Sequence, residues 1–258
     1  MRTNRTLLLI IFSLSCALFA QTQWAKKDWK KWSEDECKIL LEDSPWASTF
    51  KESNAQVNNL GNRNNSGTRT DARIETSYTV QLRSALPIRQ AVARQILIQN
   101  KYDKASDEQK KSLLEKTLPF LDRSYEDVIV VHVVYGSNVA QYENEMMVYW
   151  QTHFPIGTVP QDAFLNTPSA KKIAPIRFIS PRGAAHEFEL IFPRTVNGEP
   201  VIEPHDKTIS VEFVTPSVGT AATLTHGNVT ESSGGSAGRR AYVEFNVDKM
   251  KVNGKLAY

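Results

Sequence analysis

Cysteine is almost absent from this chain of 258 residues, which contains only Cys16 and Cys37. Cys16 lies in an apolar segment near the start, so only Cys37 remains if that segment is removed as a signal peptide. No internal disulfide can then form, and stability has to come from a packed apolar core. Cys37 precedes Leu40 and Leu41 at helical spacing, which is typical of a buried thiol and not of a nucleophile.

An excess of charge of one sign is also lacking. Lys and Arg number 31, of which two lie in residues 1–20, against 28 Asp and Glu, so the chain without that segment carries a net charge of +1. No basic run and no basic stripe interleaved with aromatic residues occurs. The sequence therefore lacks the electrostatic footprint of a nucleic-acid binder, and we expect no nucleic-acid partner.

The common motifs of catalysis and of metal binding are missing as well. The five histidines do not form H-x-x-x-H or H-E-x-x-H, and no G-x-S-x-G, P-loop or G-x-G-x-x-G occurs. We predict no metal and no cofactor. His132 lies in a β-branched run, which favours a hydrogen-bonded core or edge histidine over a ligand. Carboxylate pairs for glycoside hydrolysis need no local motif, so the sequence does not test for them.

Residues 1–20 read as a signal peptide, with Arg2 and Arg5 before an apolar run from Leu7 to about Phe19 and with Ala20 at the cleavage position. The alternative is an uncleaved anchor, but the run is shorter than the roughly 20 residues of a spanning helix. Lipidation at Cys16 is less favoured, because the residues before it do not fit a lipoprotein signal. We predict an extracytoplasmic protein, periplasmic or secreted, with no membrane span after cleavage.

Four of the five tryptophans lie within 23 residues, at positions 24, 29, 32 and 46. Such a cluster indicates a small packed unit, a docking surface or a ligand platform. Apolar spacing predicts a helix over 24–43, and Pro45 ends it. Ser33 with Glu36 forms a capping box, which is compatible with a break or restart of the helix at Ser33. We therefore divide this region into an N-terminal Trp-rich helical segment (21–52) and a polar linker (53–71) rich in Asn, Gly and Ser.

Residues 72–258 are predicted to form a β-rich α+β domain. A strand over 74–82 precedes two helices, over 84–102 and 106–119, and a buried strand over 127–136 follows. Residues 145–152 fit a strand or a helix, and we favour a strand. Further strands are predicted over 173–179, 186–192, 208–214 and 241–247, with hairpin turns at the two Asn-Gly pairs and a flexible loop over 216–238.

These elements predict the fold class α+β: an antiparallel β-sandwich-like domain with an inserted helical pair and an N-terminal Trp-rich helix. A doubly wound βαβ fold is excluded by the pattern, because helices do not alternate with strands after residue 121.

Four phrases carry a resemblance: W-K-K-W-S-E-D-E-C-K-I-L-L-E-D-S-P-W at 29–46, S-A-L-P-I-R-Q-A at 84–91, F-P-R at 192–194 and K-M-K-V-N-G-K-L at 249–256. The chain resembles uncharacterised exported bacterial proteins that share a Trp-rich helix ending in S-P-W and a C-terminal K-M-x-x-x-G-K strand. The resemblance implies bacterial export and one recurring architecture, and it implies no activity and no catalytic residues.

The candidate docking residues are Trp29, Trp32, Pro45 and Trp46, which we expect to anchor the Trp-rich segment by burial. Arg89 and Arg194 are lesser candidates, outside any catalytic role.

The leading hypothesis is a non-enzymatic binding or structural module of the cell envelope, with an envelope protein or a glycan as partner. The alternative is an exported hydrolase acting on glycans, with Trp24 or Trp150 stacking on sugars. A third option, binding of a small hydrophobic ligand, needs an enclosed cavity. A cleft with two carboxylates about 5–9.5 Å apart beside an exposed tryptophan would favour the hydrolase.

Overall fold

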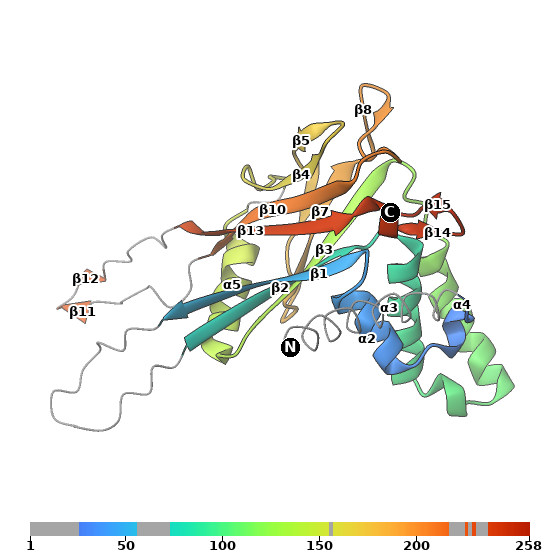
Figure 1. Cartoon of the computed structure of the whole chain (residues 1–258). Helices are drawn as coiled ribbons and strands as arrows, with labels where there is room; N and C mark the ends of the chain where they lie inside the picture. The colour runs from blue at the N-terminus through green and yellow to red at the C-terminus, as the bar shows by residue number, and fades with distance from the viewer. Residues whose placement is uncertain (1–25, 56–72, 155–156, 217–224, 227–228, 231–236) are drawn as a thin grey trace, which may run out of the picture.

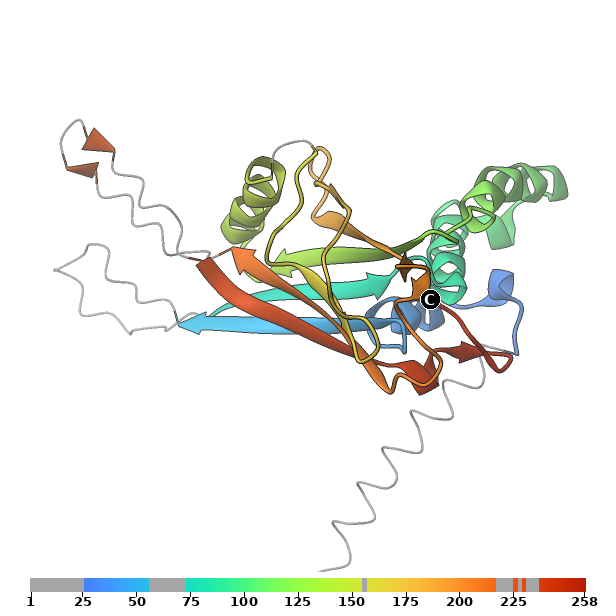
Figure 2. The ribbon, with the colours of Figure 1, turned by 90° about the horizontal axis from the view of Figure 1, so that it is seen from above.

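The computed structural model describes residues 26–55, 73–154, 157–216, 225–226, 229–230 and 237–258. Two antiparallel sheets form a sandwich-like α+β fold, as predicted (Figures 1 and 2). Sheet A has the order β1 (Ala47–Ala55), β2 (Arg73–Leu82), β3 (Val128–Ser137), β7 (Glu187–Pro193) and β6 (Arg177–Ile179). Sheet B has the order β13 (Ala237–Asn246), β10 (Thr208–Pro216), β4 (Phe164–Thr167) and β5 (Lys171–Ile173).

The main apolar core lies between the two sheets, because alternate residues of each strand point inward. Phe213 of β10 meets Tyr78 of β2 and Phe188 of β7, with ring centroids 5.6 and 5.7 Å apart. In β3, Val131 and Val133 are buried in the same core. The prediction of a buried central strand at this position is confirmed.

Three helices gather at one end of the sheets: α2 (Glu34–Glu42) and the inserted pair α3 (Leu86–Gln99) and α4 (Asp107–Leu121) (Figures 1 and 2). The predicted capping boxes begin α2 at Ser33 and α4 at Ser106. Pro119 lies inside α4, which continues to Leu121 and does not end at the proline. Three short 3₁₀ turns also occur among the described residues: η1 (Trp29–Lys31), η2 (Tyr102–Lys104) and η3 (Val247–Lys249).

The strands β1 and β4 were not predicted. Residues 47–55, within the Trp-rich segment and the start of the linker, form β1 and pair antiparallel with β2, with Phe50 opposite Tyr78. The sequence A-S-T-F-K-E-S-N-A has little apolar alternation, so its strand structure depends on its partner and not on its own propensity. β1 also lies close to β13, where Glu52 is 3.5 Å from Arg239.

The strand predicted over 145–152 is wrong, because these residues belong to helix α5 (Ala140–Thr152). Tyr142, Met146 and Trp150 are buried at a spacing of four residues, which places them on one helical face. Trp150 packs on Phe188 with ring centroids 4.1 Å apart. The β-propensity of Val148, Tyr149 and Trp150 was the misleading signal, and burial at helical spacing overrides it.

The single strand predicted over 173–179 is also wrong, because the structure divides it between the two sheets. β5 ends at Ile173 in sheet B, and β6 begins at Arg177 in sheet A. Pro175 lies between them and has no N–H for a continuous ladder. The chain therefore crosses from one sheet to the other at this proline.

Both Asn-Gly pairs form the predicted hairpin turns. Asn197 and Gly198 join β8 (Thr195–Val196) to β9 (Glu199–Pro200) with φ of 53° and 87°. Asn253 and Gly254 join β14 (Lys251–Val252) to β15 (Lys255–Leu256) with φ of 51° and 77°. Positive φ at both turn residues is the requirement that Asn-Gly meets.

The predicted signal peptide and most of the linker over 53–71 lie outside the described residues. Of the predicted loop over 216–238, the described parts include two short paired strands, β11 (Thr225–His226) and β12 (Val229–Thr230). Among the described helices, none combines the length and the apolar character needed to cross a bilayer.

Candidate binding groove beside Trp29

The four candidate docking residues differ in exposure. Trp32 and Trp46 are 2% and 1% exposed, whereas Trp29 and Pro45 are half-buried. Trp29 packs against the edge of the core without entering it. Trp150, a candidate for sugar stacking in the hydrolase hypothesis, is 1% exposed and therefore does not present its ring to solvent. Trp24 lies outside the described residues.

Trp46 fixes the start of β1 to the far end of the chain. Its indole N–H donates to the carbonyl of Ala257 at 2.5 Å, and the N–H of Ala257 donates to the carbonyl of Met250 at 2.9 Å. The Trp-rich segment and the C-terminal hairpin β14–β15 are thereby held side by side. This contact spans more than two hundred residues of sequence, and nothing in the local pattern indicates it.

The indole N–H and the backbone carbonyl of Trp32 are both hydrogen-bonded. Its indole N–H donates to the carbonyl of Lys27 at 3.2 Å, and its own carbonyl accepts from Arg94 Nε at 2.7 Å. Arg94 is 4% exposed and also forms a bidentate pair with Asp103, at 2.8 and 3.1 Å. The sequence reasoning missed Arg94, although its position between Ala91 and Leu97 on the apolar stripe of α3 was a usable signal.

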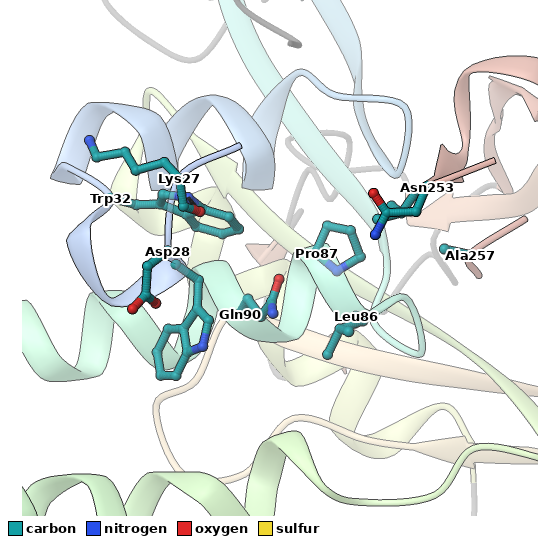
Figure 3. A pocket seen from close by; sticks show the side chains of 10 residues that line it. Lys27, Asp28, Trp32, Leu86, Pro87, Gln90, Asn253 and Ala257 are labelled. Atoms are coloured by element: carbon teal, nitrogen blue, oxygen red, sulfur yellow. Dashed lines mark hydrogen bonds between the residues drawn. The ribbon is translucent and has the colours of Figure 1, made fainter. Parts of the chain in front are cut away.

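Between η1, the first turn of α3 and the β14–β15 hairpin lies a groove with a volume of about 340 Å³ (Figure 3). Its apolar wall consists of Trp29, Trp32, Leu86, Pro87, Val252 and Ala257. Its polar groups come from Lys27, Asp28, Gln90 and Asn253. In the view of Figure 3, Pro87 and Gln90 lie between Asp28 on one side and Asn253 on the other.

Several polar groups of the groove are not used by the fold. The side-chain amides of Gln90 and Asn253 have no hydrogen-bond partner among the described residues, and the same holds for the indole N–H of Trp29. Amides offer both donors and acceptors, so each can bind a ligand group of either kind. Unused polar groups beside an apolar wall are the usual composition of a ligand site.

The charges at the groove are neutralised within the protein. Lys27 Nζ lies 2.7 Å from Glu36, and Asp28 accepts from the backbone N–H of Lys30 at 3.0 Å with Lys30 Nζ at 3.5 Å. Partial burial opposes ionisation of Glu36, but hydrogen bonds from Lys27 and Ser33 hold the pKa of this carboxyl below its usual value. The groove therefore presents no unbalanced charge to a ligand.

A second polar cluster lies on the opposite face of sheet A from the core. His132 of β3 is 3% exposed, and its ring nitrogens lie 3.3 Å from Glu187 and 3.5 Å from Glu189, without hydrogen-bond geometry. The interaction with His132 holds the pKa of both carboxyls below its usual value, against the opposing effect of burial. The His132 ring is buried and ties β3 to β7, whereas the Glu187 side chain is half exposed.

The two arginines suggested by the sequence hold backbone carbonyls. Arg89 donates to the carbonyl oxygens of Leu121 and Arg123, so it joins α3 to the end of α4. Arg194 Nε donates to the carbonyl of Tyr125 at 3.0 Å, and its guanidinium lies 4.3 Å from the centre of the Tyr258 ring. Arg194 thus fixes the C-terminal residues beside the end of β7.

The four phrases that carried the resemblance meet around this end of the molecule. Trp29 and Pro87 line the groove, Trp46 and Met250 bind Ala257, and Arg194 binds Tyr258. Sequence reasoning missed Gln90 and Leu86, because a helical amide and an exposed leucine carry no signal of their own. Asn253 was noticed only for its turn.

Among the described residues, no group of three or more His, Cys, Asp or Glu side chains is arranged to hold a metal ion. Comparison of the whole chain with family models, with curated proteins and with solved structures found no match.

Proposed function

We propose that this chain is a non-enzymatic binding module of the bacterial cell envelope, exported by the signal peptide in residues 1–20, and that the groove beside Trp29 is its ligand surface. The observation that carries the proposal is the difference in burial among the tryptophans. Trp32 and Trp46 are buried and hold the segment on the domain, whereas Trp29 is half-buried and lines the groove.

The composition of the groove supports binding over catalysis. Among the described residues that line it, Asp28 is the only carboxylate, and the groove contains no histidine, serine or cysteine. Glycoside hydrolysis uses two carboxylates on either side of the scissile bond. The alternative of a glycan hydrolase therefore has no second carboxylate among the described residues that line this groove.

The test is a cosedimentation assay with purified residues 21–258 and bacterial envelope fractions. We expect the wild-type protein to bind an envelope fraction and Trp29→Ala to lose at least about tenfold in apparent affinity, which corresponds to about 1.4 kcal/mol. The matched control is Tyr242→Ala, because Tyr242 is an aromatic residue 53% exposed on β13, outside the groove. The control should bind like the wild type.

Two results would refute the proposal. One is binding that Trp29→Ala leaves unchanged, and the other is no binding to any envelope fraction by protein with native circular dichroism. Release of reducing ends from envelope polysaccharide by the wild type, and not by Trp29→Ala, would refute the non-enzymatic function and support the glycan hydrolase.

A further inference from the structure

We infer that the ligand of the groove is an uncharged saccharide, with one sugar ring stacked on Trp29 and its hydroxyl groups bound by Gln90 and Asn253. This inference rests on the proposed function and adds the chemical class of the ligand. It follows from three properties of the groove: its apolar ring surfaces, its unused hydrogen-bonding groups and its lack of unbalanced charge.

The apolar wall suits the face of a pyranose. One face of many sugar rings presents C–H groups with a partial positive charge, and the face of an indole ring carries the negative part of its quadrupole. Trp29 supplies such a ring, and Leu86, 44% exposed, adds apolar surface next to Pro87.

The polar groups suit hydroxyls. A hydroxyl both donates and accepts, and a planar amide can bind two neighbouring hydroxyls at once, one through its oxygen and one through its nitrogen. The amides of Gln90 and Asn253 are unpartnered among the described residues, and Asp28 adds an acceptor at the rim. Figure 3 shows Asp28 and Asn253 on either side of Gln90, so hydroxyls on both edges of a ring could be met.

The charge balance argues against ionic ligands. Lys27 is paired with Glu36 at 2.7 Å, and Asp28 is bound by Lys30. A phosphate or uronate would compete with Glu36 for Lys27, and a basic peptide would compete with Lys30 for Asp28. An uncharged ligand meets neither competition.

A proline-rich peptide is the main competitor, because such peptides bind grooves lined by aromatic rings. Those grooves hold each proline between neighbouring aromatic ridges. Here Trp32 is 2% exposed, so Trp29 is the single aromatic ridge among the described lining residues. One ring with amides on its flank fits a stacked sugar better than a polyproline helix.

The first experiment titrates residues 21–258 with uncharged hexasaccharides, namely cellohexaose, maltohexaose, xylohexaose and mannohexaose, and follows tryptophan fluorescence and heat of binding. We expect one of them to bind, with a loss of about tenfold or more in Trp29→Ala and of about threefold to tenfold in Gln90→Ala. A hexagalacturonate and a decaproline peptide should not bind. Binding of either in preference to all four uncharged sugars would overturn the inference.

Asn253 is tested by Asn253→Gly and not by alanine, because its φ of 51° is tolerated by glycine. This variant keeps the β14–β15 turn and removes the amide, and it should lose about threefold to tenfold in sugar affinity. Tyr242→Ala serves again as the control with unchanged affinity. An Asn253→Gly protein of native stability and full sugar affinity would remove Asn253 from the site.

The second experiment separates failure of this inference from failure of the proposed function. The envelope fraction that binds the protein is treated either with periodate, which cleaves vicinal diols of sugars, or with protease. We expect periodate to abolish the Trp29-dependent binding and protease to leave it. The reverse result would refute the saccharide and leave the envelope-binding function standing, whereas binding independent of Trp29 would refute the proposed function itself.

Discussion

At the scale of single residues, the tryptophans show that one residue type serves two purposes in this chain. A buried indole contributes apolar area and needs a partner for its N–H, and Trp46 finds that partner in the carbonyl of Ala257. Trp29 retains an N–H without a partner among the described residues. The difference has consequences for stability that can be measured directly.

We expect Trp46→Phe to lower the free energy of unfolding by about 2–4 kcal/mol, because it leaves a cavity and an unsatisfied carbonyl. Trp29→Phe should cost about 1 kcal/mol or less, since this side chain is half-buried. Urea denaturation followed by circular dichroism measures both. Equal costs for the two variants would show that Trp29 and Trp46 contribute to packing alike, and that Trp29 is not set apart as a ligand-binding side chain.

Cys37 illustrates a residue whose environment the sequence predicted well. It is fully buried, and this burial raises the pKa of its thiol to about 11, so the thiolate is scarce at neutral pH. The apolar spacing with Leu40 and Leu41 was sufficient for this prediction. Arg94 is the opposite case, because its environment was not predicted. It is a charged residue on the apolar face of α3, and the partners that allow its burial lie on other elements.

At the scale of elements, Arg94 connects α3 to the Trp-rich segment and to η2. It joins the carbonyl of Trp32 to the carboxylate of Asp103. The hydrogen bond from Arg94 is the main cause that holds the pKa of the Asp103 carboxyl below its usual value, with burial acting in the opposite direction. A lowered pKa in the folded state contributes stability above the unfolded pKa, and this contribution is lost as pH falls through the folded pKa.

We therefore expect Asp103→Asn to be less stable than the wild type by up to about 1 kcal/mol at pH 7, a modest value because Asp103 is exposed. The difference between the two proteins should shrink as the pH falls below about 4. Urea denaturation at several pH values measures it. Asp127→Asn, at an exposed aspartate, is the control and should track the wild type at every pH. A constant difference for Asp103→Asn would mean that the ion pair is not the cause.

At the scale of the whole molecule, the C-terminal residues join parts of the chain that are remote in sequence. Ala257 binds Trp46 and Met250, and the Tyr258 hydroxyl donates to the carbonyl of Ile202 at 3.1 Å. Arg194 contacts both the carbonyl and the ring of Tyr258. These contacts also bring the β14–β15 hairpin to the groove.

Removal of Ala257 and Tyr258 should lower the free energy of unfolding by about 2–5 kcal/mol, because the buried indole N–H of Trp46 and the half-buried guanidinium of Arg194 lose their acceptors. In this truncated protein, Trp46→Phe should cost less than it costs in the full chain, which a double-mutant cycle measures. Tyr258→Phe, which removes one hydroxyl, should cost only about 1 kcal/mol. A truncated protein as stable as the full chain would show that these contacts do not hold the ends together.

Much of the fold could be predicted from local patterns. The helical pair, both capping boxes, both Asn-Gly turns and the β-branched strand β3 each depend on neighbouring residues, and each was found. β1, β4 and α5 were missed. β1 takes its structure from pairing with β2, β4 from pairing with β10, and the burial of α5 depends on the packing of Trp150 against Phe188. Of the groove, the sequence singled out Trp29 and Trp32 but not Gln90 or Leu86.

The sequence by itself determined that the short Trp-rich segment must dock on a larger surface, either its own sheet or another protein. It also determined that packing, not a disulfide, must stabilise the chain, because helical periodicity and cysteine count are local properties. Only the tertiary structure decided which tryptophan stays accessible and what surrounds it. Exposure depends on contacts between η1, α3 and the C-terminal hairpin, and these segments are far apart in the chain. Hydrophobic burial specifies that apolar side chains are covered but does not specify by which partner.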